Sequence, residues 1–401
     1  MNMNYQNYLS KTANDLEPSG IRKFFDLAAS MEGVISLGVG EPDFITPWNI
    51  REVAIEALQD GYTSYTANAG LLELREEITS YLKRKFHVNY RAEDQVIVTV
   101  GASQSLDLAF RAILNPGDEV LVIEPAFVSY ASLVTLAGGV PVRIATKEEN
   151  GFKVTPEQME AAITDKTKAI LLCSPNNPTG TCLNKEELNE IARVVKEHDL
   201  LVVSDEIYAE LAYDQEYTSF ASLPGMYERT ILINGFSKGF AMTGWRLGFL
   251  AAPSEIISAM VKIYQYTTMC APYMLQIGAI EALRNSSDQV EKMKLNYWRR
   301  RNFTVQSLNR IGLECHTPGG AFYVFPSIKK TGLTSEQFAS ELLQQEKVAV
   351  VPGNAFGESG EGYIRCSYAT SIEQLQEAMN RIERFLKTIE TKQNQKLEKA
   401  K

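Results

Sequence analysis

The sequence contains few of the residues from which metal centres and disulfide frameworks are built. Among its 401 residues are five cysteines and three histidines. The cysteines are Cys173, Cys182, Cys270, Cys315 and Cys366, which lie far apart and form no CxxC pair. An odd number of dispersed cysteines is typical of reduced, mostly buried thiols. No histidine has a second candidate ligand at metal spacing, so we expect neither a zinc site nor a Ser/His/Asp triad.

The sequence also lacks a surplus of basic residues and a long apolar run. Its formal net charge of −9 disfavours a nucleic-acid partner, because proteins that bind the phosphate backbone normally present a basic face. No stretch reaches the roughly 18 uncharged apolar residues of a membrane span, and residues 1–20 hold no apolar core of signal-peptide length. We therefore predict a globular protein of the cytoplasm that makes no membrane contact.

Short apolar runs bounded by turn residues predict the buried strands of one central sheet. They begin at Gln95, Glu119, Val140, Ala169, Leu200, Thr230 and Leu247. Helical patterns lie between most of them, so the predicted fold class is α/β, a mostly parallel seven-stranded sheet with helices on both faces. The last two runs have only a short link between them, which favours one antiparallel strand.

The pattern changes after about residue 285, where a long charged helix leads into shorter strands and further helices. This indicates a smaller α+β domain. The first forty or so residues have no place in the central sheet and are predicted to pack with this C-terminal part. The predicted domains are therefore 46–285, and 1–45 together with 286–401.

The carboxyl ends of the predicted strands are the expected place for a ligand. The first strand ends at Gly101 and a helix opens at once, so free backbone N–H groups and the helix dipole form an anion site, to which Ser103 adds a hydroxyl. "SPNNPTG", from Ser174 to Gly180, ends another strand; taken alone, it is equally compatible with a simple tight turn.

Two charged residues follow apolar strands. Asp205 ends one of them, where an unpaired carboxylate is costly to bury, so it needs a cationic partner. Lys238 stands isolated in "NGFSKGFAMTGWRLGF"; burial of its amine lowers the pKa, and such an amine forms a Schiff base with an aldehyde. An anion site, a buried acid and a desolvated amine together indicate a phosphorylated pyridine aldehyde.

With these motifs the chain resembles the fold-type I, class I pyridoxal-phosphate aminotransferases, in particular the bacterial alanine, aspartate and aromatic aminotransferase-like subgroup. "SPNNPTG", "SDEIY" and "SKGFAMTGWRLGF" occur in the family's order and spacing, and the resemblance covers nearly the whole chain. It implies pyridoxal 5'-phosphate as cofactor and a ping-pong transfer of an amino group between an L-amino acid and a 2-oxo acid.

The resemblance also implies roles for residues around the cofactor ring. Lys238 matches the lysine that bonds to the cofactor aldehyde and shuttles the substrate proton. Asp205 matches the acid that keeps the pyridine nitrogen protonated, and Asn177 and Tyr208 match the pair that binds the ring hydroxyl. Phe127 matches an aromatic that stacks on the ring, although alone it is also compatible with a core aromatic.

Further positions resemble those that bind the phosphate and the substrate. The phosphate positions are Gly101, Ala102, Ser103, Ser237 and Arg246. Tyr65 matches a tyrosine that reaches the phosphate of the other subunit, which implies a homodimer with shared sites. Arg365 matches the arginine that binds the substrate α-carboxylate, Gly40 a backbone position close to it, and Ile21 a lid residue that shields the substrate.

The substrate is predicted from two departures from the family pattern. Ser103 stands where aspartate-preferring members often have lysine, and Phe127 stands where they have tyrosine or tryptophan. We therefore expect alanine as donor and 2-oxoglutarate as acceptor. Aspartate, aromatic amino acids, methionine and an acylated diaminopimelate stay open as alternatives, and so does a carbon-sulfur β-lyase on the same fold. A ligand-sensing regulator is disfavoured, because it needs an additional DNA-binding domain.

Overall fold

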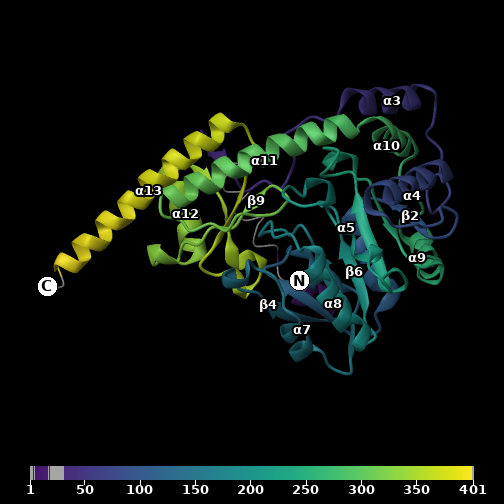
Figure 1. The fold of residues 1–401 in the computed structure, drawn as a ribbon, viewed down its shortest axis with the longest axis horizontal. Coiled ribbons are helices and arrows are strands. Elements are labelled where there is room, and N and C mark those ends of the chain that lie inside the picture. The colour runs from purple at the N-terminus through teal and green to yellow at the C-terminus, as the bar shows by residue number, and fades with distance from the viewer. Residues whose placement is uncertain (1–2, 4, 17, 19–30, 400–401) are drawn as a thin grey trace.

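The computed structural model describes residues 3, 5–16, 18 and 31–399. Within them, a seven-stranded sheet has the order β2-β8-β7-β6-β5-β3-β4 (Figure 1). Its strands are β2 Val96–Thr99, β3 Glu119–Glu124, β4 Val140–Ala145, β5 Thr167–Cys173, β6 Leu201–Asp205, β7 Thr230–Gly235 and β8 Gly248–Ala251. β8 pairs antiparallel with β2 and β7, whereas the other pairs are parallel. The predicted α/β class, strand number and antiparallel member are confirmed.

Helices cover both faces of this sheet. They are α4 Leu72–Phe86, α5 Ala102–Ile113, α6 Ser129–Leu136, α7 Pro156–Ala162, α8 Lys185–Glu197, α9 Ser254–Thr267 and α10 Tyr273–Asn285. α3 Trp48–Gln59 packs on α10. The strand β5 shows why these strands are apolar throughout. Ala169 and Leu171 pack with the core of α5, α6 and α9, whereas Ile170 and Leu172 pack with that of α7 and α8. Alternate side chains of a strand point to opposite faces, so both sets are buried.

Local sequence signals fix where individual helices begin. Asn184 precedes α8, and its side chain accepts a hydrogen bond from the N–H of Glu187, while the Glu187 side chain accepts one from the N–H of Asn184. This reciprocal capping satisfies two N–H groups that the helix itself leaves free. Asn184 is therefore the N-cap of α8.

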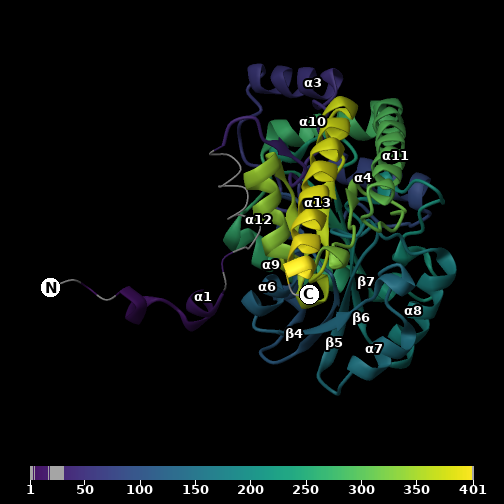
Figure 2. The same cartoon turned by 90° about the vertical axis from the view of Figure 1, so that its left-hand side faces the viewer.

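A second group of elements lies to one side of the sheet (Figure 1) and faces the viewer in Figure 2. It contains α11 Ser287–Arg310, α12 Ser335–Glu346, α13 Ile372–Lys399, β9 Tyr323–Val324, β10 Val348–Ala349, β11 Val351–Pro352 and β12 Ile364–Ser367. β12 lies between β11 and β9 in an antiparallel sheet. β1 Ile35–Ser36 pairs in parallel with β10, so the segment just before residue 45 contacts the C-terminal part. The N-terminal helix α1 spans Lys11–Asp15.

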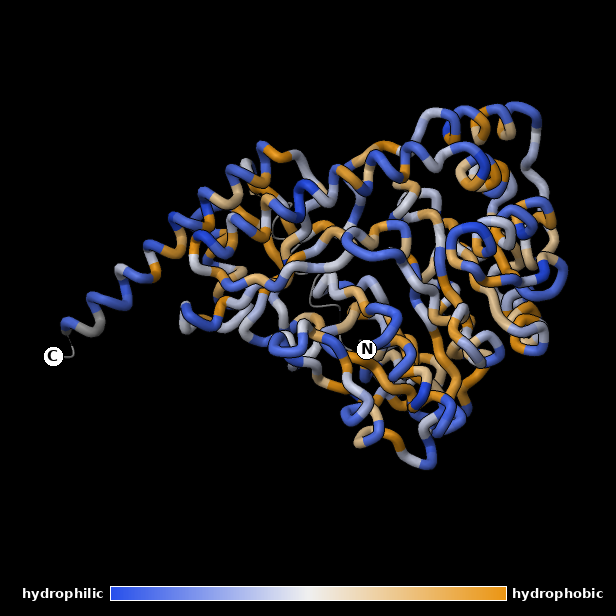
Figure 3. The backbone as a smooth tube through the Cα atoms, viewed as in Figure 1, coloured by the Kyte–Doolittle hydropathy of each residue, from blue (hydrophilic) through white to orange (hydrophobic). Residues whose placement is uncertain are grey.

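Short 3-10 helices complete the described chain: Tyr5–Tyr8, Glu148–Asn150, Ala209–Leu211, Phe220–Ser222, Tyr227–Arg229, Thr243–Trp245, Lys329–Thr331, Gly353–Phe356 and Glu358–Gly360. Figure 3 shows hydrophobic residues concentrated along the central strands, while α11 and α13 alternate between hydrophilic and hydrophobic positions. Such alternation is typical of helices that pack one face against the protein and leave the other in water.

Candidate active site

A cavity of about 510 Å³ lies at the carboxyl ends of the parallel strands. It is lined by Gly40, Glu41, Ala102, Ser103, Leu106, Phe127, Tyr130, Asn177, Asp205, Ile207, Tyr208, Ser237, Lys238, Thr243, Gly244, Arg246, Tyr323 and Arg365. Most of the residues singled out from the sequence are in this set. Asp205 and Lys238 come from strands that end at the same edge of the central sheet, whereas Gly40 follows β1 and Arg365 lies on β12. Three of the singled-out residues are not in this set: Tyr65 is 77% exposed and absent from this lining, Gly101 is absent although its neighbour Ala102 belongs to it, and Ile21 lies outside the described residues.

Lys238 follows β7 and points its amine across the cavity. Its Nζ donates a hydrogen bond to the carbonyl oxygen of Gly40 at 2.5 Å. Burial lowers the pKa of Lys238 to about 8, and the positive charges of Arg365 and Arg246 act in the same direction, against the opposing charges of Glu41 and Asp205. A substantial fraction of this amine is therefore neutral near physiological pH, as a nucleophilic lysine requires.

Asp205 ends β6 on the floor of the cavity. Burial raises the pKa of its carboxyl group, opposed by hydrogen bonds from Tyr130 and from the backbone of Ile207 and by the charge of Lys238. The Tyr130 hydroxyl donates to Oδ2 at 2.7 Å, and the Ile207 N–H donates to Oδ1 at 3.2 Å. A carboxylate with these partners can accept a further hydrogen bond from a protonated ring nitrogen.

The start of α5 forms an anion site. Gly101 precedes the helix at φ 84° and ψ 162°, a conformation that residues with a Cβ rarely adopt. A Cβ added there would lie 2.7 Å from Nη2 of Arg246, so the guanidinium lies directly over the glycine. Ser103 and Ser237 add hydroxyl groups to the same cavity. Free helix N–H groups, a guanidinium and hydroxyls together suit a phosphate.

Arg365 lies on β12 and is 3% exposed. Its Nη1 donates to Oδ1 of Asn177 at 2.9 Å and its Nη2 to the carbonyl oxygen of Gly38 at 2.6 Å. Nε is buried without a partner, and none of the ion pairs among the described residues involves this guanidinium. A buried cation that lacks a carboxylate is costly, so the site fits an anionic group of a ligand.

Sequence reasoning missed Tyr130, Tyr323 and Glu41 as cavity residues. The Tyr323 hydroxyl lies 2.9 Å from that of Tyr208, and its ring is stacked 4.5 Å from the Arg365 guanidinium carbon. A Cβ at Gly40 would lie 2.8 Å from the same hydroxyl, so only glycine fits between Tyr323 and the cavity. "GGAFYVF" contains this tyrosine, but nothing in the local pattern distinguishes it from a core aromatic.

The donor set fits pyridoxal phosphate on two observations: an anion site at Gly101 and Arg246 and, in the same cavity, a partly neutral amine near a buried carboxylate. Among the described residues, no group of three or more His, Cys, Asp and Glu side chains could hold a metal ion. No described helix is both long and apolar enough to span a membrane.

The family model described as "Aminotransferase class I and II" matches residues 32–382, so the chain belongs to this family. The family uses pyridoxal phosphate, and the protein is a transaminase.

Named relatives agree with this assignment. The chain is 66% identical to YugH of Bacillus subtilis, which is named only provisionally as an aminotransferase, over 94% of this chain and 98% of that one. It is 52% identical to an aspartate aminotransferase of Pyrococcus abyssi over 93% and 96% of the two chains. The crystal structure of an aromatic aminotransferase from Pyrococcus horikoshii superposes with a TM-score of 0.88 at 50% identity, over 92% of this chain and 99% of that one.

Proposed function

We propose that this transaminase takes its amino group from an L-amino acid with an uncharged side chain, alanine first, and passes it to 2-oxoglutarate. The observation that carries this proposal is the set of cations around the cavity. Lys238, Arg246 and Arg365 are the basic residues among its described lining, and each has a role other than binding a substrate side chain. No described lining cation is left for a second carboxylate of the donor. The distal carboxylate of 2-oxoglutarate, on the acceptor side, needs a cation from outside the described lining.

Aspartate and aromatic donors are the second candidate. Relatives that are 52% and 50% identical to this chain are named as aspartate and aromatic aminotransferases. An aromatic side chain is also uncharged and meets the same requirement as alanine, whereas aspartate needs a cation from outside the described lining.

The residues divide the work of the reaction as follows. The cofactor, when bound, supplies an aldehyde and an electron-withdrawing ring. Arg365 binds the α-carboxylate of the substrate through its guanidinium, which is 2.9 Å from Asn177 and thereby fixed in orientation. The neutral amine of Lys238 would accept the proton from the substrate α-carbon and deliver it to the cofactor carbon that carries the aldehyde, which leaves the amine neutral again.

The remaining residues hold the cofactor in place. Asp205 accepts a hydrogen bond from the ring nitrogen, and Asn177 and Tyr208 bind the ring hydroxyl. Arg246, Ser237 and the start of α5, with Gly101, Ala102 and Ser103, bind the phosphate, and Phe127 stacks on the ring. Gly40 lies close to the substrate carboxylate.

We further propose that the active enzyme is a homodimer in which Tyr65 reaches the phosphate of the neighbouring subunit. In support, Tyr65 is 77% exposed, and the segment around it carries further exposed hydrophobic side chains. These are Ile45, Trp48, Ile55, Leu58, Tyr62 and Leu72. Exposed hydrophobic side chains at this density are typical of a surface that another protein covers.

A single half-reaction tests the donor. The holoenzyme is mixed with alanine, aspartate or phenylalanine in separate experiments without any keto acid, and the cofactor absorbance and the keto acid formed are recorded. We expect alanine to yield one pyruvate per site. An unchanged spectrum with alanine and a full response to aspartate would contradict the proposal. Release of ammonia with pyruvate from a cysteine-type substrate would identify a β-lyase instead. Lys238→Ala is the control and should form no keto acid while keeping the circular dichroism of the fold.

A further inference from the structure

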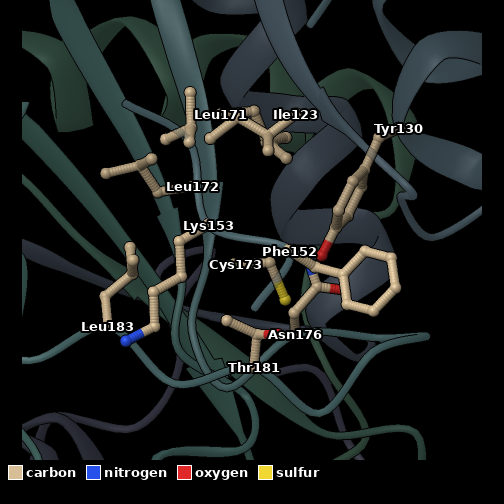
Figure 4. A pocket seen from close by; sticks show the side chains of 11 residues that line it. Ile123, Tyr130, Phe152, Lys153, Leu171, Leu172, Cys173, Asn176, Thr181 and Leu183 are labelled. Carbon is tan, nitrogen blue, oxygen red and sulfur yellow. The ribbon is translucent and has the colours of Figure 1, made fainter. Parts of the chain in front are cut away.

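Tyr130 is a buried group that the roles above leave unused. It lies in the first turn of α6 and is 2% exposed. It lines the active-site cavity and also a smaller, second cavity behind it, which we call the rear cavity. The rear cavity has a volume of about 20 Å³ and is lined by Ile123, Tyr130, Phe152, Lys153, Val154, Leu171, Leu172, Cys173, Asn176, Thr181 and Leu183 (Figure 4). Tyr130 thus separates the two cavities.

The Tyr130 hydroxyl acts as a hydrogen-bond donor to Asp205. The two oxygens are 2.7 Å apart, an ordinary length for a hydrogen bond between a hydroxyl and a carboxylate. Burial, together with the negative charge of Asp205, raises the pKa of Tyr130 well above that of an ordinary tyrosine, so the hydroxyl keeps its proton. Its ring is held by an edge contact with Phe127, with centroids 5.6 Å apart.

No other described side chain donates a hydrogen bond to this carboxylate. The Ile207 N–H serves the other oxygen, at 3.2 Å. In the rear cavity, the Cys173 thiol donates to the carbonyl of Pro175 at 3.4 Å, and the Asn176 amide nitrogen donates to the carbonyl of Pro125 at 3.5 Å. The Asn176 Oδ1 has no partner, but an oxygen cannot donate. Removal of the Tyr130 hydroxyl would therefore leave Oδ2 of Asp205 without a protein donor.

We propose that Tyr130 is a positioning residue, whose hydroxyl keeps the Asp205 carboxylate ionised and directed at the ring nitrogen of the cofactor. The proposal rests on the role proposed above for Asp205. A protonated Asp205 carboxyl group would not stabilise the charged form of the ring nitrogen. A carboxylate that rotated freely would accept the hydrogen bond of the ring nitrogen in only some of its orientations.

The test compares Tyr130→Phe with wild type and with Tyr264→Phe. Tyr264 is a matched control, because it is also buried and its hydroxyl has no described hydrogen-bond partner. The first readout uses the apoenzyme, whose thermal unfolding is followed at pH 5 and pH 8. Burial raises the pKa of Asp205 in the folded protein, so the folded protein loses stability as the pH rises and this carboxyl group ionises. Removal of the Tyr130 hydroxyl, which stabilises the ionised form, makes this loss larger.

We expect the stability deficit of Tyr130→Phe to be larger at pH 8 than at pH 5, and the Tyr264→Phe deficit to be equal at both. The second readout is the dissociation constant of pyridoxal phosphate, measured by fluorescence quenching. We expect it to rise by about tenfold in Tyr130→Phe, the usual effect of a lost hydrogen bond to a charged group, and to stay unchanged in the control. Equal deficits at both pH values, or a cofactor affinity like that of the control, would overturn the proposal.

A second variant covers the case in which Tyr130→Phe does not fold. 3-Fluorotyrosine introduced at position 130 keeps the ring and the hydroxyl and makes the hydroxyl a stronger donor. We expect cofactor affinity at least equal to that of wild type, and a fluorotyrosine protein with weaker affinity would overturn the proposal. The apoenzyme readout involves neither cofactor nor substrate, so it reports on Tyr130 and Asp205 even if the proposed donor is wrong.

Discussion

At the scale of single residues, Lys238 illustrates how surroundings make a lysine reactive. Its amine donates a hydrogen bond to the Gly40 carbonyl, and burial, helped by the positive charges of Arg365 and Arg246, lowers its pKa to about 8. An amine must be neutral to attack an aldehyde. The pKa of Lys238 in the apoenzyme therefore controls how fast the cofactor is captured.

We predict that the rate at which the apoenzyme captures pyridoxal phosphate rises with pH, and that the midpoint of this rise lies at about pH 8. Stopped-flow absorbance measures this rate. Glu41 raises the pKa of Lys238 by its negative charge, so Glu41→Gln should move the midpoint to lower pH. A wild-type midpoint near the ordinary lysine value would show that the amine is not desolvated in solution.

Arg365 supports a prediction on substrate affinity. Lysine in its place keeps the charge but loses the planar fork that binds a carboxylate at two points. We expect Arg365→Lys to raise the KM for the amino acid about tenfold to a hundredfold, with an unchanged dissociation constant for pyridoxal phosphate. Steady-state kinetics and cofactor titration measure the two effects. Loss of cofactor instead of substrate would contradict the roles of Arg365 and Arg246.

Sequence reasoning identified the residues that follow strand ends in ordered motifs, such as Asp205 and Lys238, because their place in the chain fixes their place at the sheet edge. It missed Tyr130 and Tyr323, whose importance arises only from contacts with Asp205 and Tyr208. Those contacts join residues 75 and 115 positions apart in the chain, and no local pattern records them.

At the scale of elements, the strands of the central sheet could be predicted, because most of them are buried on both faces and therefore apolar. β4 lies at the sheet edge and is largely exposed, but it still contains a short apolar run. The order of the strands could not be predicted. β2 and β3 are successive strands, yet β8, β7, β6 and β5 lie between them. This order depends on how helices pack across the whole sheet. The apolar runs of the sequence predict single strands and contain no information about which strands are neighbours.

The turn between β2 and α5 supports a prediction on cofactor binding. Gly101→Ala places a Cβ 2.7 Å from Nη2 of Arg246 and strains the backbone, whose φ is +84°. We expect the guanidinium to move away from the helix start, which raises the dissociation constant of pyridoxal phosphate about tenfold and costs about 1–3 kcal/mol of stability.

Gly117→Ala is the matched control for this turn. Gly117 has a similar φ of +90°, but a Cβ there meets open space. It should lower stability through backbone strain without changing cofactor affinity, and fluorescence titration of both variants measures the difference. If Gly117→Ala weakened cofactor binding as much as Gly101→Ala, displacement of Arg246 would not be the cause.

At the scale of the whole molecule, the two predicted domains, 46–285 and 1–45 with 286–401, stay a proposal. The pairing of β1 with β10 supports the link between the N-terminal and C-terminal parts. The cavity also draws on both parts, since Lys238 comes from the large sheet and Arg365 from β12. A substrate bound to Arg365 therefore contacts both proposed domains.

The homodimer proposal is tested by mixing two defective subunits. Lys238→Ala removes the amine and Tyr65→Ala removes the side chain proposed to act across the interface. If Tyr65 serves the partner's site, a mixed dimer has one site that contains both defects and one that contains neither. Random reassociation makes half of the dimers mixed, so we expect about a quarter of wild-type activity from two preparations that are each weakly active or inactive.

If Tyr65 does not act across the interface, the mixture has a different activity. If Tyr65 acts within its own subunit, every site in a mixed dimer carries one defect, and the mixture has the mean activity of the two variants. The subunits are mixed in mild denaturant, refolded with pyridoxal phosphate and assayed for keto acid formation, and exchange is checked by mass-labelled chains. Activity well above the mean requires that Tyr65 completes the site of the other subunit. Activity at the mean, with exchange demonstrated, would show that each subunit builds its own site.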